Sequence, residues 1–144
     1  MEDQNQVFEQ ALGLEWPWYV DRIRFDGESR LLLIHLDFEA GGTFTCGACG
    51  AVGCKAYDTT LKRWRHLDFL GYRAFLQGPS PRVDCSSCGI RQALLPWARE
   101  RQRLTLPFEE MVVSLAREMP VRAVARLLGE HDTRLTRVLD RYGQ

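Results

Sequence analysis

The first third of the chain carries a short helical pattern followed by two alternating runs. Residues 5–15 are expected to form a short helix that buries Val7, Phe8, Ala11 and Leu12. A Trp-Pro-Trp run ends this segment because proline disfavours helix in the residue before it. Two runs of β-branched and aromatic residues then flank an Asp-Gly pair at residues 26–27, which is typical of a hairpin. The positions expected on the buried face of the second run are Leu32, Ile34, Leu36 and Phe38. The pattern predicts an N-terminal helix and β-hairpin over residues 1–45.

Short extended runs separated by turn residues occupy residues 46–97. Their apolar and polar positions alternate over only a few residues at a time, which predicts several short strands paired into a β-ribbon. Such a ribbon is too small to bury a core of its own, so we expect a bound metal to supply the missing stability. A polar and basic stretch at residues 98–106 follows and is expected to be a linker.

From Thr105 onward the apolar period becomes helical. One stripe at helical spacing comprises Phe108, Met111, Val112, Leu115 and Met119. Pro120 ends that helix, and two shorter amphipathic helices follow on either side of Gly129, which supplies a left-handed turn residue. The side chains expected to face inward from these two helices are Val121, Val124, Ala125, Leu128, Leu135, Val138, Leu139 and Tyr142. Residues 107–144 are therefore predicted to form a three-helix domain with a helix-turn-helix, and the whole chain has the α+β fold class.

Two Cys-x-x-Cys pairs lie at the borders of the predicted ribbon. The sequences CGACG and CSSCG each close with a glycine, which can take the positive φ of a tight knuckle. Two such knuckles can bring four thiolates to one Zn²⁺, so the expected ligands of a single structural zinc ion are Cys46, Cys49, Cys85 and Cys88. Disulfides are the first alternative, and a reducing cytosol disfavours them. A thiol-redox enzyme is the second, but it needs one exposed pair of low pKa rather than two matched knuckles. The fifth cysteine, Cys54, is expected to be a bystander.

Charge is segregated along the chain although the formal net charge is zero. Residues 1–45 hold nine acidic and three basic side chains, residues 46–107 hold four and ten, and residues 108–144 hold six of each. This separation of an acidic head from a basic middle indicates a division of roles. The chain opens on an acidic polar stretch rather than a signal peptide, and its longest aliphatic run, residues 31–34, is far too short for a membrane span. We expect a soluble cytoplasmic protein that does not associate with membranes.

The second of the two short C-terminal helices has the character of a DNA-recognition helix. In a helix-turn-helix this helix presents its N-terminal residues to the major groove, while the preceding helix meets the backbone. The candidate DNA contacts are His131, Thr133, Arg134, Arg137 and Arg141, with Arg122 and Arg126 on the preceding helix. Asp132 would repel phosphate there and is expected to cap the helix instead. The alternative is a helical hairpin used for packing or dimerisation, with the arginines as ordinary solvated charge.

Basic residues of the ribbon and linker form a second set of candidate DNA contacts. They are Lys62, Arg63, Arg65 and Arg73, grouped around Trp64, together with Arg101 and Arg103 of the linker. One interpretation is a phosphate-contacting face with an aromatic residue at its centre, continued by an arm laid along the DNA. The other is solvated strand charge around a core tryptophan, followed by a plain spacer. Both remain open from the sequence.

Several motifs together resemble one family of mobile-element proteins. The two cysteine knuckles, the stretches RWRHLDF and PRVDCSSCG, the PWAR segment and MPVRAVARLLG are similar to bacterial insertion-sequence transposases of the ISL3 family. The similarity extends to ALGL and WYVDRIRFD near the N-terminus, so it covers nearly the whole chain. A zinc ribbon or a helix-turn-helix alone would not be specific, but their combination with these stretches is.

The resemblance implies a function in DNA transposition. In that family a zinc-binding domain and a helix-turn-helix precede a much longer catalytic domain of the three-carboxylate, ribonuclease-H-like type. The resemblance implies recognition of the element's terminal inverted repeats, and the four cysteines match the family's metal ligands. We therefore expect a zinc-dependent, sequence-specific DNA-binding module without catalysis, associated with the bacterial nucleoid, either excised from a longer protein or the product of a truncated gene. Its expected partners are double-stranded DNA, the catalytic domain of the full-length transposase and, as a further candidate, a second copy of the chain.

Two alternative functions remain open at this point. One is a free-standing repressor, such as a truncated transposase that occupies element ends or a promoter. The other is a protein-interaction or dimerisation module that uses the ribbon as its docking surface. An open reading frame that continues past Gln144 into a carboxylate-bearing domain would distinguish the transposase module from the repressor.

Overall fold

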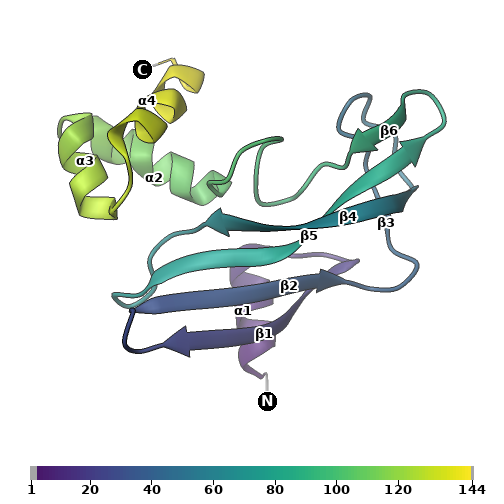
Figure 1. Ribbon diagram of the computed structural model, residues 1–144, viewed down its shortest axis with the longest axis horizontal. Coiled ribbons are helices and arrows are strands. Elements are labelled where there is room, and N and C mark those ends of the chain that lie inside the picture. The colour runs from purple at the N-terminus through teal and green to yellow at the C-terminus, as the bar shows by residue number, and fades with distance from the viewer. Residues whose placement is uncertain (1–2, 144) are drawn as a thin grey trace. The chain divides into compact units, whose positions relative to one another are not determined.

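The computed structural model describes residues 3–143, and the chain divides into two compact units, residues 1–105 and 106–144. Met1 and Glu2 of the expected N-terminal domain, and Gln144 at the end of the expected helix-turn-helix domain, lie outside the described residues. The first unit is built mainly on strands and the second on helices (Figure 1), so the α+β class is confirmed.

A six-stranded mixed sheet forms the first unit. Its strands are β1 (Trp18–Asp26), β2 (Leu31–Phe38), β3 (Thr43–Phe44), β4 (Cys54–Arg65), β5 (Arg73–Cys85) and β6 (Gly89–Gln92). The spatial order is β1-β2-β5-β4-β3, and β6 pairs with β5. Only β2 and β5 pair in parallel, and the other pairings between these strands are antiparallel. The predicted hairpin is confirmed as β1 and β2, which join through a turn where the Asp26 carboxylate accepts from the backbone N–H of Glu28.

Aliphatic side chains of the sheet and an aromatic cluster form the core of this unit. Alternate residues of a strand point to the same face of the sheet. Leu32 of β2 and Leu76 of β5, on neighbouring strands, both lie on the core face and are completely buried. Trp97, which follows β6, contacts Trp18 and Trp64 edge-to-face, with ring centroids 4.7 and 5.2 Å apart. This geometry suits the quadrupoles of aromatic rings. The core therefore draws on segments far apart in the sequence.

The N-terminal helix, α1 (Gln4–Leu12), lies against this sheet (Figure 1). It begins with a capping box, in which the Asp3 carboxylate accepts from the Gln6 backbone N–H and the Gln6 side chain accepts from the Asp3 backbone N–H. Phe8 and Leu12 pack against the core as their spacing predicted, whereas Val7 is 51% exposed. The helix thus covers the sheet with a narrower apolar stripe than expected.

The expectation of a separate ribbon without a core of its own is wrong. The parallel ladder between β2 and β5, with Leu33 opposite Phe75 at its centre, joins the N-terminal hairpin and the ribbon into one sheet. Trp64 of the ribbon shares its core with Ile34 of the hairpin. The first unit runs on to residue 105, so the predicted boundaries at residues 45 and 97 do not separate compact units. The predicted start of the helical domain, residue 107, lies one residue after the start of the second unit at Leu106.

Three helices form the second unit: α2 (Leu106–Ala116), α3 (Val121–Leu128) and α4 (Asp132–Arg141). The predicted inward positions Val124, Leu135 and Val138 are buried. In α2, Val113 is buried and Met111 is 40% exposed, so the buried side of this helix is rotated from the expected stripe. Within residues 3–143, no helix has the length and apolar character that a bilayer crossing requires.

Candidate metal centre and nucleic-acid interface

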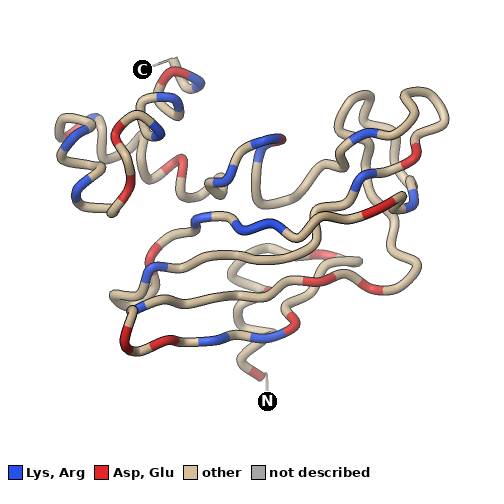
Figure 2. Tube along the Cα trace, viewed as in Figure 1, with Lys and Arg blue, Asp and Glu red and all other residues tan. Residues whose placement is uncertain are grey.

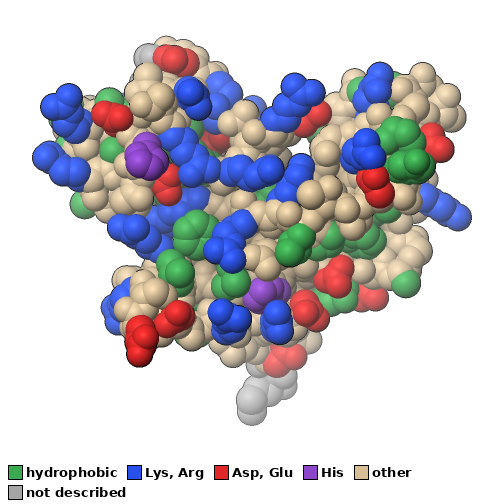
Figure 3. All heavy atoms as spheres, in the orientation of Figure 1, with side chains coloured by type: hydrophobic (Ala, Val, Ile, Leu, Met, Phe, Trp, Pro, Cys, Tyr) green, Lys and Arg blue, Asp and Glu red, His purple; other side chains and the backbone are tan. Residues whose placement is uncertain are grey.

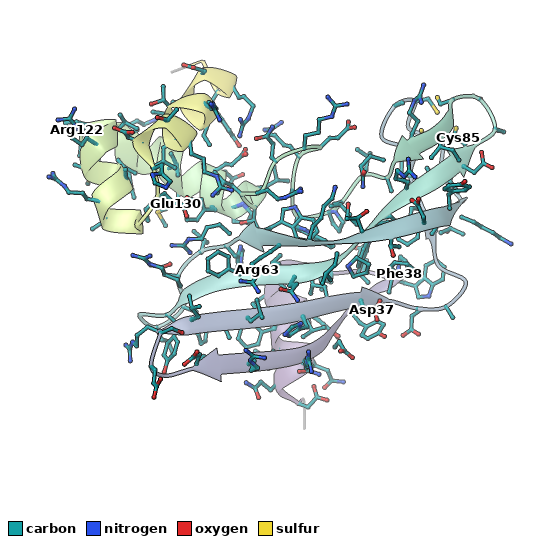
Figure 4. The ribbon with its side chains drawn as sticks, in the orientation of Figure 1. Asp37, Phe38, Arg63, Cys85, Arg122 and Glu130 are labelled. Atoms are coloured by element: carbon teal, nitrogen blue, oxygen red, sulfur yellow. The ribbon has the colours of Figure 1, made fainter. Side chains whose placement is uncertain are left out.

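Four cysteines of the two knuckles converge at one end of the sheet, where Cys85 is labelled in Figure 4. Their sulfur atoms all lie within 4.8 Å of one another, and those of Cys49 and Cys85 are 3.6 Å apart. A disulfide needs a separation of about 2.05 Å. Tetrahedral zinc with bonds of about 2.3 Å places its sulfurs about 3.8 Å apart. The four residues thus fit a zinc ion far better than two disulfides.

Backbone geometry shapes the two knuckles as the sequence predicted. The Gly50 N–H donates to the Cys46 carbonyl oxygen at 2.9 Å, and both Gly50 and Gly89 adopt a φ of 77°, which favours glycine. The second knuckle closes the β5–β6 hairpin, in which Cys85 lies opposite Gly89. A bridge between Cys46 and Ala93 then brings the first knuckle beside the strand that leaves the second. Two separate turns are thereby held around one point.

The pKa values of Cys85 and Cys88 show how strongly the four thiols affect one another at this distance. Backbone N–H groups of Ser87 and Cys88 lower the pKa of Cys85 to about 7. A hydrogen bond with Cys49, followed by burial, raises the pKa of Cys88 to about 12. Thiolates this close repel one another, so all four ionise together only around a positive ion. Cys54 lies outside the group, and its thiol donates to the Ala51 carbonyl oxygen.

The candidate DNA-reading residues at the start of α4 lie on the surface of the second unit. Gly129 has a φ of 69° and forms the predicted left-handed turn between α3 and α4. His131 is the N-cap, and Asp132 is the first helical residue, so the expectation that Asp132 caps α4 is wrong. Its carboxylate instead lies in the first turn, where the helix dipole favours negative charge. The exposed residues of this unit that were predicted to contact DNA include His131, Thr133, Arg137, Arg122 and Arg126.

The three arginines predicted to form a stripe on α4 differ in their surroundings. The Arg141 guanidinium donates to the carboxylate of Glu109 at 2.6 Å, and the Glu109 side chain is fully buried. Arg141 therefore serves the packing of α4 on α2, which argues against its predicted role as a DNA contact. Arg134 forms a 3.0 Å ion pair with Glu130, one turn earlier in the chain. Arg137 is exposed and forms no ion pair within residues 3–143.

The predicted basic face of the ribbon is not a single face. Neighbouring residues of a strand point to opposite sides of the sheet, so Lys62 lies on the side of the buried Trp64 and Arg63 on the other. Arg65 is only 2% exposed, and its guanidinium pairs with the Asp68 carboxylate at 2.7 Å. The prediction that Arg65 contacts DNA is therefore wrong, because its charge is held inside the unit.

Two further arginines of the predicted ribbon face lie on the side of the sheet opposite Trp64. Arg63, labelled in Figure 4, donates to the side-chain oxygen of Gln77 at 2.8 Å and remains exposed. Arg73 is exposed at the start of β5. Both stay candidates for contact with DNA.

Basic residues of the expected linker lie in a loop that returns to the sheet. Arg101 and Arg103 line one recess together with Lys62 of β4. Figure 2 shows further Lys and Arg positions along the strands near the second knuckle. Two of those, Arg82 and Arg91, were missed in the sequence analysis. Arg82 lies three residues before Cys85, and Arg91 lies three residues after Cys88. The knuckle between them closes a hairpin, and this hairpin was the sequence feature from which both positions could have been predicted.

The chain matches two families over adjacent regions. Residues 42–88 match the family described as the zinc-finger of transposase IS204/IS1001/IS1096/IS1165. Residues 93–143 match the family described as the helix-turn-helix domain of transposase family ISL3. The first region contains all four clustered cysteines, and the second contains all three helices of the second unit.

Curated relatives agree with these matches. The transposase for insertion sequence element IS1557 of Mycobacterium tuberculosis is 28% identical over 129 residues, covering 85% of this chain and 29% of the relative. The transposase for insertion sequence element IS1001 of Bordetella parapertussis is 34% identical over 121 residues, covering 81% of this chain and 30% of the relative. The chain thus spans about 30% of the length of these relatives. No solved structure matches. The predicted resemblance is confirmed: the chain resembles the N-terminal region of ISL3-family transposases, with a zinc ribbon and a helix-turn-helix.

Proposed function

We propose that this chain is the sequence-specific DNA-binding module of a transposase, which recognises the terminal inverted repeats of its element and has no catalysis of its own. The relatives are named as transposases and are about three times longer than the aligned region, which leaves length for a catalytic domain as its partner. DNA binding also places its work in the bacterial cytoplasm, at the nucleoid.

The observation that carries this proposal is the exposed side of α4. Thr133 and Arg137 lie one turn apart near the start of this helix, and both are exposed. Arg137 has no carboxylate partner among the described residues, so its guanidinium is free to donate to a guanine edge in the major groove. Arg122, labelled in Figure 4, and Arg126 are exposed on α3, where the first helix of such a motif meets phosphate.

The zinc centre has a structural role in this proposal. Four thiolates fill the tetrahedral coordination of one Zn²⁺ and leave no position for a reacting water. The ion would fix the end of the sheet where β3, β5 and β6 meet, because those strands carry or flank the four ligands. The ion would join two turns that are far apart in the sequence, and the side chains of the protein would make the contacts to DNA.

Substitution of Arg137 tests whether α4 reads the bases of the terminal repeat. Arg137→Ala should weaken binding to a duplex that carries the terminal repeat by about 1–3 kcal/mol and should leave binding to an unrelated duplex nearly unchanged. Fluorescence anisotropy with the two labelled duplexes measures both affinities. Equal losses on the two duplexes would show that Arg137 contacts only phosphate, and would contradict its role in reading bases. Arg117→Ala, at an exposed position just after α2, is the matched control.

A further inference from the structure

The segment after the ribbon is a fixed loop instead of a flexible spacer. The Arg65 N–H donates to the Arg103 carbonyl oxygen at 2.8 Å, and the Thr105 N–H donates to the Arg65 carbonyl oxygen at 2.9 Å. A bridge between Ala98 and Thr105 closes the base of the loop. Leu104, which is 2% exposed, anchors it in the unit. Residues 99–103 therefore project from a closed base on β4.

Arg101 has an unusual conformation within this loop. Its φ is 64°, in the left-handed region that costs a non-glycine residue about 1 kcal/mol or more. The turn that produces this φ places Arg101 over the strands, where it lines two adjoining recesses together with Lys62. The loop thus holds a basic side chain at a defined place on the sheet.

The larger of these recesses collects positive charge from four separate elements. Its cations are Lys62 of β4, Arg82 of β5, Arg91 of β6 and Arg101 of the loop, and it encloses about 280 Å³. Figure 3 shows Lys and Arg side chains along both borders of the gap between the loop and the β5–β6 end of the sheet. Only one carboxylate, that of Glu100, lines the same recess.

Most of these cations lack a negative partner. Arg82 is engaged by the Asp58 carboxylate in a bidentate pair whose Nε–Oδ1 distance is 2.8 Å. Lys62, Arg91 and Arg101 form no ion pair in the described part of the chain. Burial, and then the charge of Arg103, lower the pKa of Lys62, while Glu100 opposes the shift. Positive groups held together against their mutual repulsion are suited to an anion that arrives from outside.

We propose that this recess binds a phosphate of the DNA backbone, as a contact of the sheet unit that is distinct from the DNA-reading surface of α4. The inference rests on the proposed function and adds the site by which the sheet unit would take part. A polyanion suits it better than a small anion because Arg99 and Arg103 extend the basic lining along the adjoining recess. Such a contact carries no sequence information and adds affinity that depends on salt.

The test uses a double variant of the chain, Lys62→Gln with Arg101→Gln. At 0.1 M salt, the affinity of this variant for DNA should fall about tenfold, and the loss should be the same for the terminal-repeat duplex and for an unrelated duplex. The slope of log K against log salt should become shallower by about one. Lys55→Gln, at an exposed position of the same strand, is the control and should leave the slope unchanged. Zinc content and circular dichroism verify that the variants are folded.

A variant that is expected to raise the affinity for DNA tests the proposal even if the double variant fails to fold. Glu100→Gln removes the carboxylate of the recess and should raise the affinity for both duplexes about two- to fivefold. A folded double variant with the slope of Lys55→Gln, or no gain with Glu100→Gln, would overturn the phosphate site. Neither result would touch the proposed function, which fails instead if the unaltered chain binds the two duplexes equally or not at all.

Discussion

The two units of the chain hold themselves together by different means. The sheet unit joins distant segments through an aromatic cluster and four sulfurs, whereas the helical unit relies on short apolar stripes and a buried carboxylate, Glu109. Each unit also contains an arginine with an internal partner: Arg65 pairs with Asp68, and Arg141 pairs with Glu109. The comparison teaches that a basic residue in a DNA-binding chain can belong to the scaffold. Metal removal should therefore affect the first unit, and loss of one ion pair the second.

The largest effect is expected from loss of a metal ligand. Cys85→Ser leaves three thiolates, and the two turns would no longer share an ion. We expect the sheet unit to lose more than about 5 kcal/mol of stability, because metal binding energy is folding energy in such sites. The helical unit should keep its structure, since its three helices contain none of the four cysteines. Cys54→Ser is the control and should retain zinc. Zinc analysis and denaturation followed by tryptophan fluorescence report on the sheet unit, because all four tryptophans lie in it. The circular dichroism signal of the helices reports on the helical unit. Unchanged zinc content in Cys85→Ser would contradict the four-sulfur centre.

The buried ion pair of the helical unit should give the next largest effect. Arg141→Met removes the cation beside the fully buried Glu109, leaving the Tyr142 hydroxyl donating to that carboxylate at 3.2 Å. Breaking one side of such a pair costs about 3 kcal/mol or more. Arg137→Met, on the same helix, should change stability by less than about 0.5 kcal/mol because its side chain is exposed. Thermal unfolding of both variants, followed by the circular dichroism signal of the helices, measures this difference in stability. Equal stability of the two would show that the pair with Glu109 contributes nothing.

A smaller, pH-dependent effect is expected in the sheet unit from His66. Burial, followed by the charge of Arg65, lowers the pKa of His66 to about 4, and its Nδ1 lies 2.8 Å from the Thr105 hydroxyl. The unfolded chain binds a proton near pH 6.5 whereas the folded chain does not, so stability falls as the pH drops from about 6.5 towards 4. Between pH 7 and pH 5 the loss is about 2 kcal/mol.

The matched variant for this effect is His66→Asn, which keeps a hydrogen-bonding side chain but cannot ionise. Urea unfolding of both proteins at the two pH values isolates the histidine, because acid also protonates zinc ligands in both. The original protein should lose about 2 kcal/mol more than the variant on going from pH 7 to pH 5. Parallel losses would mean that His66 is accessible to protons in the folded state.

Local patterns predicted the features that depend on neighbouring residues. The cysteine pairs, the knuckle glycines, the β1–β2 hairpin and the turn at Gly129 follow from short spacings that the backbone must obey. The parallel pairing of β2 with β5 could not be predicted in this way, because it joins strands about 40 residues apart and no local signal specifies its register. The roles of Arg65 and Arg141 depend on that kind of long-range packing. The spacing of charges alone made both appear to be surface residues.

The most direct test of the central claim is the affinity of the unaltered chain for DNA with and without zinc. The chain should bind a duplex carrying the element's terminal repeat at least about a hundredfold more tightly than an unrelated duplex in the same salt. Verified removal of zinc should weaken that binding, because the sheet unit would lose the ion that joins its two knuckles. Equal affinity for the two duplexes, or full-strength binding by protein shown to be free of zinc, would contradict a zinc-dependent, sequence-specific DNA-binding module.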